Sequence, residues 1–368
     1  MLTFLSLMCF TMTTFVSISP VTCQPPPPLS GASICANTLY PKFCRSTLLP
    51  YNRTGTVTDY CRISLRQSLS HARKFLKLVS ENRKRAPLSF PSSIGPLDDC
   101  VFLAHENVDI LQFALESVEF RDNLGIMLTG DIQALLSSTL TNIDTCLDGF
   151  TGSAASTDLA DPVANATKLC SMSLNLFDKG WLRHGKKKTR ILRERKHTFS
   201  ELPNGVADGL PLKMNSWDAK RFQSLTKGRV LQEASNSSVN VASFVVVDQF
   251  GRGNFTTIND AVSNAPNSSF FGTDESFFVI FVAEGIYEEY VTIPRNKRSI
   301  MMIGEGINKT IITGNKSVID GFTTFNSSTF AVIGQGFVGV NITIRNTAGA
   351  IKHQAVALRN SADMSSFY

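Results

Sequence analysis

Two short apolar runs stand close together in residues 300–315, which have the sequence IMMIGEGINKTIITGN. The runs Ile300–Ile303 and Thr310–Thr313 contain β-branched and other apolar residues, and a segment with Gly and Asn separates them. Runs of this length, bounded by turn-forming residues, are typical of strands rather than helices. The stretch therefore predicts two short strands joined by a turn.

The same pattern continues on both sides of this stretch. It does not alternate with long helices, although residues 257–264 predict one short helix. Short strands that stack without crossover helices favour a parallel β-helix, in which each turn of the chain is covered by its neighbours. A β-sandwich is the alternative that the pattern leaves open. Further strands are predicted at 244–247, 277–282, 330–333 and 340–344.

The N-terminal half has a different period. Apolar residues recur every three or four positions from Leu97 to Val118, which predicts an amphipathic helix. The same spacing predicts helices over 61–79, 132–143 and 163–177. Short connections between such helices are typical of an antiparallel bundle, so we expect a four-helix bundle here. With 368 residues, the chain is long enough for two domains.

The first residues indicate a secreted protein. Residues 1–21 form an apolar run without charged side chains, which predicts a signal peptide. A membrane anchor is the alternative, but Pro20 and Pro25–Pro28 end the run short of the roughly 20 apolar residues that a span needs. Acceptor sequons favour the secretory route independently. They occur at Asn52, Asn165, Asn236, Asn254, Asn267, Asn308, Asn315, Asn326 and Asn341.

An oxidising compartment favours disulfides at the cysteines that follow the signal peptide. These cysteines show neither a CxxC pair nor zinc-like spacing with histidine, so we expect no zinc site here, and no other motif predicts a cofactor. Sequence alone leaves their pairing open. They are Cys35, Cys44, Cys61, Cys100, Cys146 and Cys170.

The net charge of +6 is partly concentrated in residues 183–196. No aromatic residues interleave with these charges, so nucleic acid is a poor partner for the stretch. A solvated linker is the favoured interpretation, and a polyanionic carbohydrate is a physically equivalent partner for a mildly basic surface. Helical periodicity fails over this region. We expect a signal peptide at 1–23, a helical region at 24–180, a linker with a basic processing region at 181–240 and a β-helical region at 241–368.

Common hydrolase signatures are missing from the sequence, since neither Gly-x-Ser-x-Gly nor His-Glu-x-x-His occurs. The β-rich half does contain a set of motifs that, in order and spacing, closely resembles plant pectin methylesterases. They are Gly285-Ile286-Tyr287-Glu288-Glu289-Tyr290-Val291, Ile311-Ile312-Thr313-Gly314-Asn315, Asp320-Gly321-Phe322-Thr323-Thr324-Phe325-Asn326-Ser327, Asn346-Thr347-Ala348-Gly349 and Lys352-His353-Gln354-Ala355-Val356-Ala357-Leu358-Arg359.

The helical half resembles the inhibitor-like pro-region that many of these enzymes carry. The matching motifs are Leu97-Asp98-Asp99-Cys100 and residues 141–150, which read TNIDTCLDGF. The resemblance implies a four-helix bundle with disulfides Cys35–Cys44 and Cys100–Cys146. It leaves the state of Cys61 and Cys170 open.

For the β-rich half the resemblance implies a right-handed parallel β-helix. The implied activity is hydrolysis of methyl esters of cell-wall homogalacturonan to pectate and methanol, outside the cell and without a metal. Two aspartates carry the reaction in such enzymes, and glutamine amides stabilise the oxyanion. Gln354 matches the first of these glutamines, and Thr324 matches a substrate-contacting threonine.

The matching catalytic aspartates would follow Tyr368, so the β-helix is expected to be incomplete and this chain inactive as it stands. Two hypotheses follow from the resemblance. In the first, the chain is a precursor whose helical half acts within the same molecule, as an inhibitor or folding aid, until cleavage near Lys220 and Arg221. In the second, it is a non-catalytic secreted protein whose helical domain inhibits other pectin methylesterases.

Overall fold

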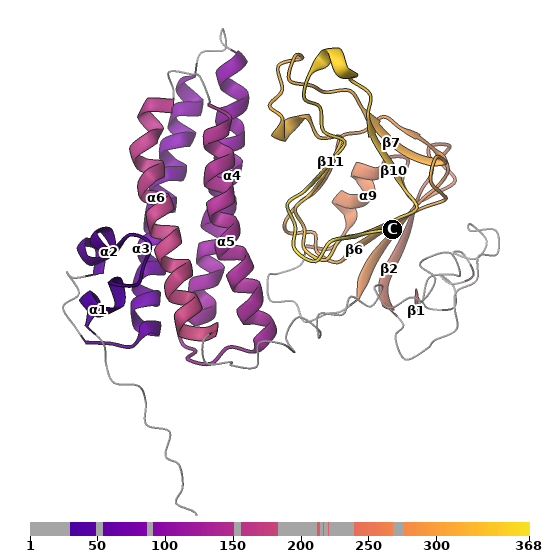
Figure 1. Cartoon of the computed structure of the whole chain (residues 1–368). Coiled ribbons are helices and arrows are strands. Elements are labelled where there is room, and N and C mark those ends of the chain that lie inside the picture. The colour runs from indigo at the N-terminus through magenta and orange to yellow at the C-terminus, as the bar shows by residue number, and fades with distance from the viewer. Residues whose placement is uncertain are drawn as a thin grey trace, which may run out of the picture.

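The computed structural model describes residues 30–48, 54–86, 91–150, 156–182, 212–213, 216, 220, 239–267 and 276–368. The predicted signal peptide, Arg221 and most of the predicted linker lie outside these residues. Two bodies lie side by side (Figure 1). We call residues 31–182 the helical half and residues 239–368 the β half.

Four long helices form the bundle predicted for the helical half, each longer than its apolar period indicated. Periodicity marks only the packed middle of a helix, whereas polar caps extend its ends. The side chain of Thr56 accepts a hydrogen bond from the backbone of Asp59, whose carboxylate accepts one from the backbone of Thr56. The elements are α1 (Gly31–Cys35), α2 (Pro41–Leu48), α3 (Val57–Arg85), α4 (Pro91–Val118), α5 (Ile126–Asp148), α6 (Ser156–Phe177) and the π-helical η2 (Asp178–Leu182).

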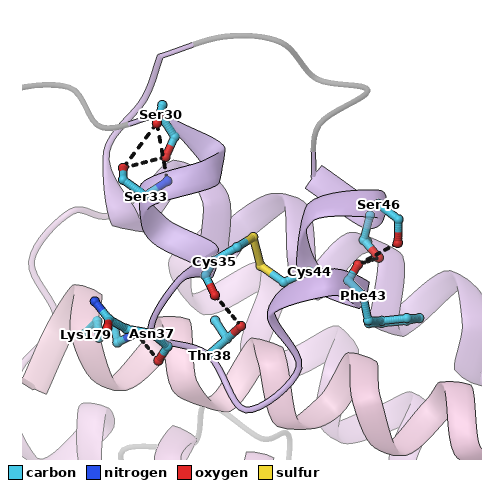
Figure 2. Close-up of a disulfide and its surroundings, with 10 residues drawn as sticks. Ser30, Ser33, Cys35, Asn37, Thr38, Phe43, Cys44, Ser46 and Lys179 are labelled. Atoms are coloured by element: carbon cyan, nitrogen blue, oxygen red, sulfur yellow. Dashed lines mark hydrogen bonds between the residues drawn. A yellow bond between two sulfur atoms is a disulfide. The ribbon is translucent and has the colours of Figure 1, made fainter.

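Disulfides join the helices in pairs. Cys35 is bonded to Cys44 between α1 and α2 (Figure 2), and Cys100 is bonded to Cys146 between α4 and α5. These are the pairings that the resemblance implies. Lys179 donates a hydrogen bond from Nζ to the carbonyl oxygen of Asn37 at 2.8 Å, which ties the α1–α2 hairpin to the end of the bundle.

Cys61 and Cys170 are both buried in the core of the bundle, and both are free thiols. Cys61 contacts the backbone oxygen of Ser173, whereas Cys170 lines a small space near Ser68 and His71. The two thiols therefore lie at different levels of the contact between α3 and α6.

The β half is a parallel β-helix, as predicted, because every strand pair in it is parallel. The described strands form three sheets, ordered β1-β2-β3-β6-β9-β12, β10-β7-β4 and β11-β8-β5, so that each turn of the coil adds one strand to each face. The strands are β1 (Leu212–Lys213), β2 (Val239–Val247), β3 (Phe277–Val282), β4 (Gly285–Tyr287), β5 (Val291–Ile293), β6 (Ile300–Gly304), β7 (Thr310–Gly314), β8 (Phe330–Val332), β9 (Val338–Val340), β10 (Thr343–Asn346), β11 (Leu358–Asn360) and β12 (Ser366–Phe367).

One strand prediction was wrong. Residues 340–344 are not a single strand, because β9 ends at Val340 and β10 begins at Thr343 on another face of the coil. Asn341 has a φ of 55° and turns the chain between the two sheets. Asparagine tolerates this left-handed conformation better than most residues do. The corner therefore depends on Asn341, which the strand prediction had counted as part of a continuous strand.

Apolar side chains fill the inside of the coil, and a short helix covers the core near its first strands. α9 (Ile258–Asn264) contributes Ile258, Ala261 and Val262 to the same buried cluster as the inward residues of the strands. Thr257 caps this helix by accepting a hydrogen bond from the backbone of Asp260 at 3.1 Å. The helix predicted at 257–264 is therefore confirmed (Figure 1).

Candidate functional site

Thr324 lies in a turn between β7 and β8. It precedes the short 3₁₀ helix η4 (Phe325–Ser327), its side chain is exposed, and it makes no side-chain hydrogen bond to the described residues. The backbone around it is firmly held, since Ser327 donates from Oγ to the Thr324 carbonyl oxygen at 2.8 Å. Ser327 also accepts a hydrogen bond from the backbone of Val356 at 3.1 Å, so the turn is joined to the segment that follows Gln354.

Gln354 lies in the loop between β10 and β11, just after the short helix η5 (Ala350–Lys352). Its side chain is exposed, and the amide makes no hydrogen bond to the described residues. Its carbonyl oxygen accepts a hydrogen bond from the backbone of Val318 at 3.0 Å, which fixes the loop against the segment after β7. An exposed, unengaged amide is available to a ligand, whereas an amide stacked inside the coil would not be.

Asn346 holds these segments together. From Nδ2 it donates to three carbonyl oxygens, those of Lys316 at 2.9 Å and of Ser327 and Val356 at 3.2 Å. The turn that carries Thr324 and the loop that carries Gln354 thus share one half-buried amide. The sequence analysis assigned Asn346 no role. Its signal was only that it opens the motif Asn346-Thr347-Ala348-Gly349.

The helical half contacts the turn on both sides of Thr324. Figure 1 shows α4 on the side of the bundle that faces the β half. Asp99 of α4 accepts a hydrogen bond at Oδ2 from the hydroxyl of Thr323, and one at Oδ1 from Nδ2 of Asn326 at 2.6 Å. Only 4% of Asp99 is exposed. The helical half therefore sits on the turn that presents Thr324.

An aromatic and cationic contact extends this interface along α4. Phe102 lies one turn after Asp99, and its ring centroid is 6.0 Å from that of Phe325. The guanidinium of Arg359 lies 3.6 Å from the centroid of Phe325 and 5.9 Å from that of Phe102. Such stacking of a guanidinium on a ring is favourable, particularly where water is largely excluded. The contact therefore combines apolar packing with charge.

Burial shifts the titration of both charged groups at this interface. It raises the pKa of Asp99 to about 6, against the hydrogen bonds from Thr323 and Asn326 and the charge of Arg359, which favour the carboxylate. It lowers the pKa of Arg359 to about 10, although Asp99 and Glu106 oppose that shift. Asp99 therefore holds a proton up to a higher pH than an ordinary aspartate.

The next contact along α4 is an ion pair, one helical turn after Phe102. Glu106 of α4 forms an ion pair with Arg295, which lies just after β5. A cavity of about 570 Å³ adjoins this pair, between the acidic face of α4 and the loop containing Arg295 and Arg298. Asp99, Phe102 and Glu106 thus lie on one face of α4 at the spacing of successive helical turns, and this face is the interface between the halves.

Other predicted features lie outside this site. Lys220 is exposed, and its neighbour Arg221 is not among the described residues. Within the part of the chain that the structure describes, no group of three or more His, Cys, Asp or Glu residues could hold a metal ion. No helix in that same part has both the length and the apolar character of a membrane span.

Two family models match the chain, one in each half. Residues 244–368 match the model described as pectinesterase, and residues 31–176 match the model described as plant invertase/pectin methylesterase inhibitor. The two matches coincide with the β half and the helical half.

Individual relatives agree with these matches. The chain is 43% identical over 342 residues to probable pectinesterase/pectinesterase inhibitor 20 of Arabidopsis thaliana, covering 92% of this chain and 60% of the relative. It is 45% identical over 370 residues to probable pectinesterase/pectinesterase inhibitor 7 of the same plant, and this match covers 92% of this chain and 62% of the relative. The solved structure of a pectin methylesterase from carrot matches at 46% identity and a TM-score of 0.33, covering 37% of this chain and 40% of that one. The chain thus spans about 60% of the length of the curated relatives it matches.

Proposed function

Because this chain belongs to the plant pectinesterase/pectinesterase inhibitor family, we propose that it is part of a pectin methylesterase precursor whose helical half covers the pectin-binding side of its β half. The reaction would be hydrolysis of the methyl ester of a galacturonate residue, with water consumed and methanol and a carboxylate formed. The precursor would act after secretion, in the cell wall. The observation that carries the proposal is the pair of hydrogen bonds from Thr323 and Asn326 to Asp99.

Gln354 would stabilise the transition state of this reaction. When the ester carbonyl is attacked, negative charge develops on its oxygen, and a fixed amide donor at that position lowers the barrier. The exposed amide of Gln354 has no competing partner among the described residues, which supports this role. The nearby carboxylate of Asp320 is held by Lys352 and Ser317, and we assign it no catalytic role.

Thr324 would contact the bound polysaccharide. Its hydroxyl is exposed between two residues that hydrogen-bond to the helical half. A polymer that runs over this turn would compete with α4 for the same surface. Cleavage of the connection near Lys220 and Arg221 would make the contact between the halves intermolecular and allow the helical half to leave.

The alternative hypothesis assigns the helical domain to the inhibition of separate pectin methylesterases. The α4 face with Asp99, Phe102 and Glu106 is already engaged by the β half of the same chain. A second enzyme would have to displace these contacts. We therefore favour action within the molecule.

The test uses the full gene product that carries this chain, secreted from plant cells. Methanol release from methylesterified homogalacturonan is measured before and after protease cleavage between the halves, with the wild type and with Gln354→Ala. Removing one oxyanion donor is expected to lower kcat about 10²-fold with little change in KM. Gln249→Ala is the matched control, because Gln249 hydrogen-bonds to the backbone of Ile286, away from Gln354.

Two results would overturn the proposal. One is methanol release that is unaffected by Gln354→Ala while Gln249→Ala behaves like the wild type. The other is a gene product that neither binds methylesterified homogalacturonan nor releases methanol from it after the halves have been separated.

A further inference from the structure

A second pocket lies beside the loop that carries Gln354 and is formed by the β half alone. Its volume is about 380 Å³. The residues that line it come from the segment after β7 and from the loop after β10, and most of them are exposed while the helical half is in place. The polar and aromatic lining residues are Asn315, Lys316, Asp320, Phe322, Thr347 and Lys352.

Lys316 is held between two aromatic rings in this pocket. Its Nζ lies 3.8 Å from the ring centroid of Tyr290 and 4.8 Å from that of Phe322. Tyr290 is itself fixed, because its hydroxyl donates to Oδ1 of Asn315 and accepts from the backbone of Asn315, both at 3.0 Å. Gly314 allows this packing, since a Cβ there would lie 2.7 Å from the ring of Tyr290.

The charges in the pocket leave one ammonium group without an anionic partner. Asp320 is engaged on both oxygens, by Lys352 on Oδ1 and by the hydroxyl of Ser317 on Oδ2 at 2.6 Å. Lys316 forms no ion pair with any carboxylate among the described residues. Burial lowers the pKa of its ammonium group, and no nearby carboxylate offsets that effect. An anion placed beside Lys316 would compensate for the hydration that its ammonium group loses on burial.

The pocket is structurally continuous with the proposed catalytic side. Gln354 lies two positions after Lys352, and its carbonyl oxygen accepts the hydrogen bond from Val318 in the segment that carries Lys316. Asn346 joins the carbonyl oxygen of Lys316 to the same network. A polymer bound across Gln354 would therefore place a neighbouring sugar in this pocket.

We propose that this pocket is a subsite for a galacturonate residue with a free carboxylate, bound by the ammonium group of Lys316 and flanked by the rings of Tyr290 and Phe322. The inference rests on the proposed function, because it takes the polymer to be homogalacturonan. Tyr290 and Phe322 are each 36% exposed, and their rings can pack against the apolar face of a sugar ring. A carboxylate accepts a charge-assisted hydrogen bond from an ammonium group, whereas a methyl ester offers only a neutral acceptor. The subsite therefore prefers a residue that has already lost its ester.

The test compares two probes by isothermal titration calorimetry at fixed ionic strength, on this chain after protease cleavage between its halves. The probes are hexagalacturonate and the same hexamer with all carboxylates methylesterified. The wild type is expected to bind the free acid more tightly. Lys316→Met removes the charge and keeps an apolar stem, and should weaken binding of the free acid about tenfold while leaving the esterified hexamer unchanged. Lys316→Arg should keep the preference.

Lys309→Met is the matched control for the loss of one positive charge. Lys309 is exposed and lies at the opposite end of β7, outside the pocket. If Lys309→Met weakens binding of the free acid as much as Lys316→Met does, the effect is one of net charge and the subsite is refuted. Equal affinity of the wild type for the two probes also refutes it, while leaving the proposed function intact. If the wild type binds neither probe after the halves have been separated, the proposed function fails as well.

Discussion

Asn326 donates a hydrogen bond from Nδ2 to Oδ1 of Asp99 at 2.6 Å, joining two residues that lie 227 positions apart in the chain. One residue belongs to a helix of the bundle and the other to a turn of the β-helix. With Thr323 bound to the second oxygen of the same carboxylate, the contact holds the turn on both sides of Thr324. The carboxylate is buried, so these two hydrogen bonds satisfy its oxygens in place of water.

Replacing Asp99 with alanine should loosen this turn. The change leaves the Thr323 hydroxyl and the Asn326 amide without their acceptor, which costs about 1–3 kcal/mol at a buried site. Hydrogen exchange of the full chain, followed by mass spectrometry, should show faster exchange in residues 321–328. Asp98→Ala is the control, because Asp98 pairs with Arg83 inside the helical half. Equal protection of this segment in Asp99→Ala and the wild type would contradict the assigned contact.

The same carboxylate should make the stability of the chain depend on pH. Burial raises the pKa of Asp99 to about 6, from 3.8 for an unperturbed aspartate. The folded state therefore binds more protons than the unfolded state between these values, and the free energy of unfolding falls as pH rises through this window. The contribution is fully present below about pH 4 and lost above about pH 6.

Asp99→Asn isolates this effect from the other titrating groups. Asparagine retains an acceptor oxygen but does not titrate, so the variant should lose the part of the pH dependence that Asp99 supplies. Denaturant unfolding of both proteins at several values between pH 4 and 7 measures the difference. A wild-type minus variant difference that stays constant across the window would show that Asp99 does not titrate there.

Much of the fold could be predicted from the sequence because it depends on local periodicity. The apolar spacing from Leu97 to Val118 marked α4, and the β-branched runs marked β6 and β7. Periodicity could not find β4 and β5, which have three residues each. Nor could it separate β9 from β10, because the corner between them depends on the backbone conformation of Asn341.

The interface between the halves could not be predicted from the sequence, for a different reason. Asp99, Phe102 and Glu106 follow a helical spacing of their own, beside the apolar stripe that packs into the bundle. A second face of this kind indicates a contact but does not identify the partner residue. Gln354 and Thr324 were predicted as site residues only through resemblance. Asn346 was missed because its role depends on three carbonyl oxygens from separate segments.

The two disulfides should stabilise the helical half unequally. Cys100–Cys146 spans 46 residues, and Cys35–Cys44 spans 9. The chain-entropy relation gives about 4 kcal/mol for the longer loop and about 3 kcal/mol for the shorter one. Serine at both Cys100 and Cys146 should therefore lower the free energy of unfolding more than serine at both Cys35 and Cys44. Denaturant unfolding of the two double variants provides the comparison, and a larger loss for the shorter loop would contradict the entropic argument.

The free thiols of Cys61 and Cys170 should be unreactive in the folded protein. Both are buried, and burial raises the pKa of Cys170 to about 11 and shifts the pKa of Cys61 upward as well. The thiolate is the reactive form, so alkylation by iodoacetamide at pH 7.5 should be negligible at both positions. In guanidinium chloride both should be alkylated at the rate of an ordinary thiol. Peptide mapping that found the two joined in a disulfide would refute this assignment.

Gly334 should be essential to the stacking of the coil. A Cβ at this position would lie 2.1 Å from the carbonyl oxygen of Lys297 and 2.8 Å from that of Pro294, and both atoms belong to the neighbouring turn of backbone. Backbone cannot move aside as a flexible side chain can, so Gly334→Ala should cost at least the roughly 1–3 kcal/mol of an overpacked core. Gly306→Ala is the matched control, because its Cβ would meet only the side chain of Lys309 at 3.2 Å. Denaturant unfolding should therefore show a large loss for Gly334→Ala and little change for Gly306→Ala, and equal stabilities would mean that adjacent turns of the coil pack less closely than this geometry requires.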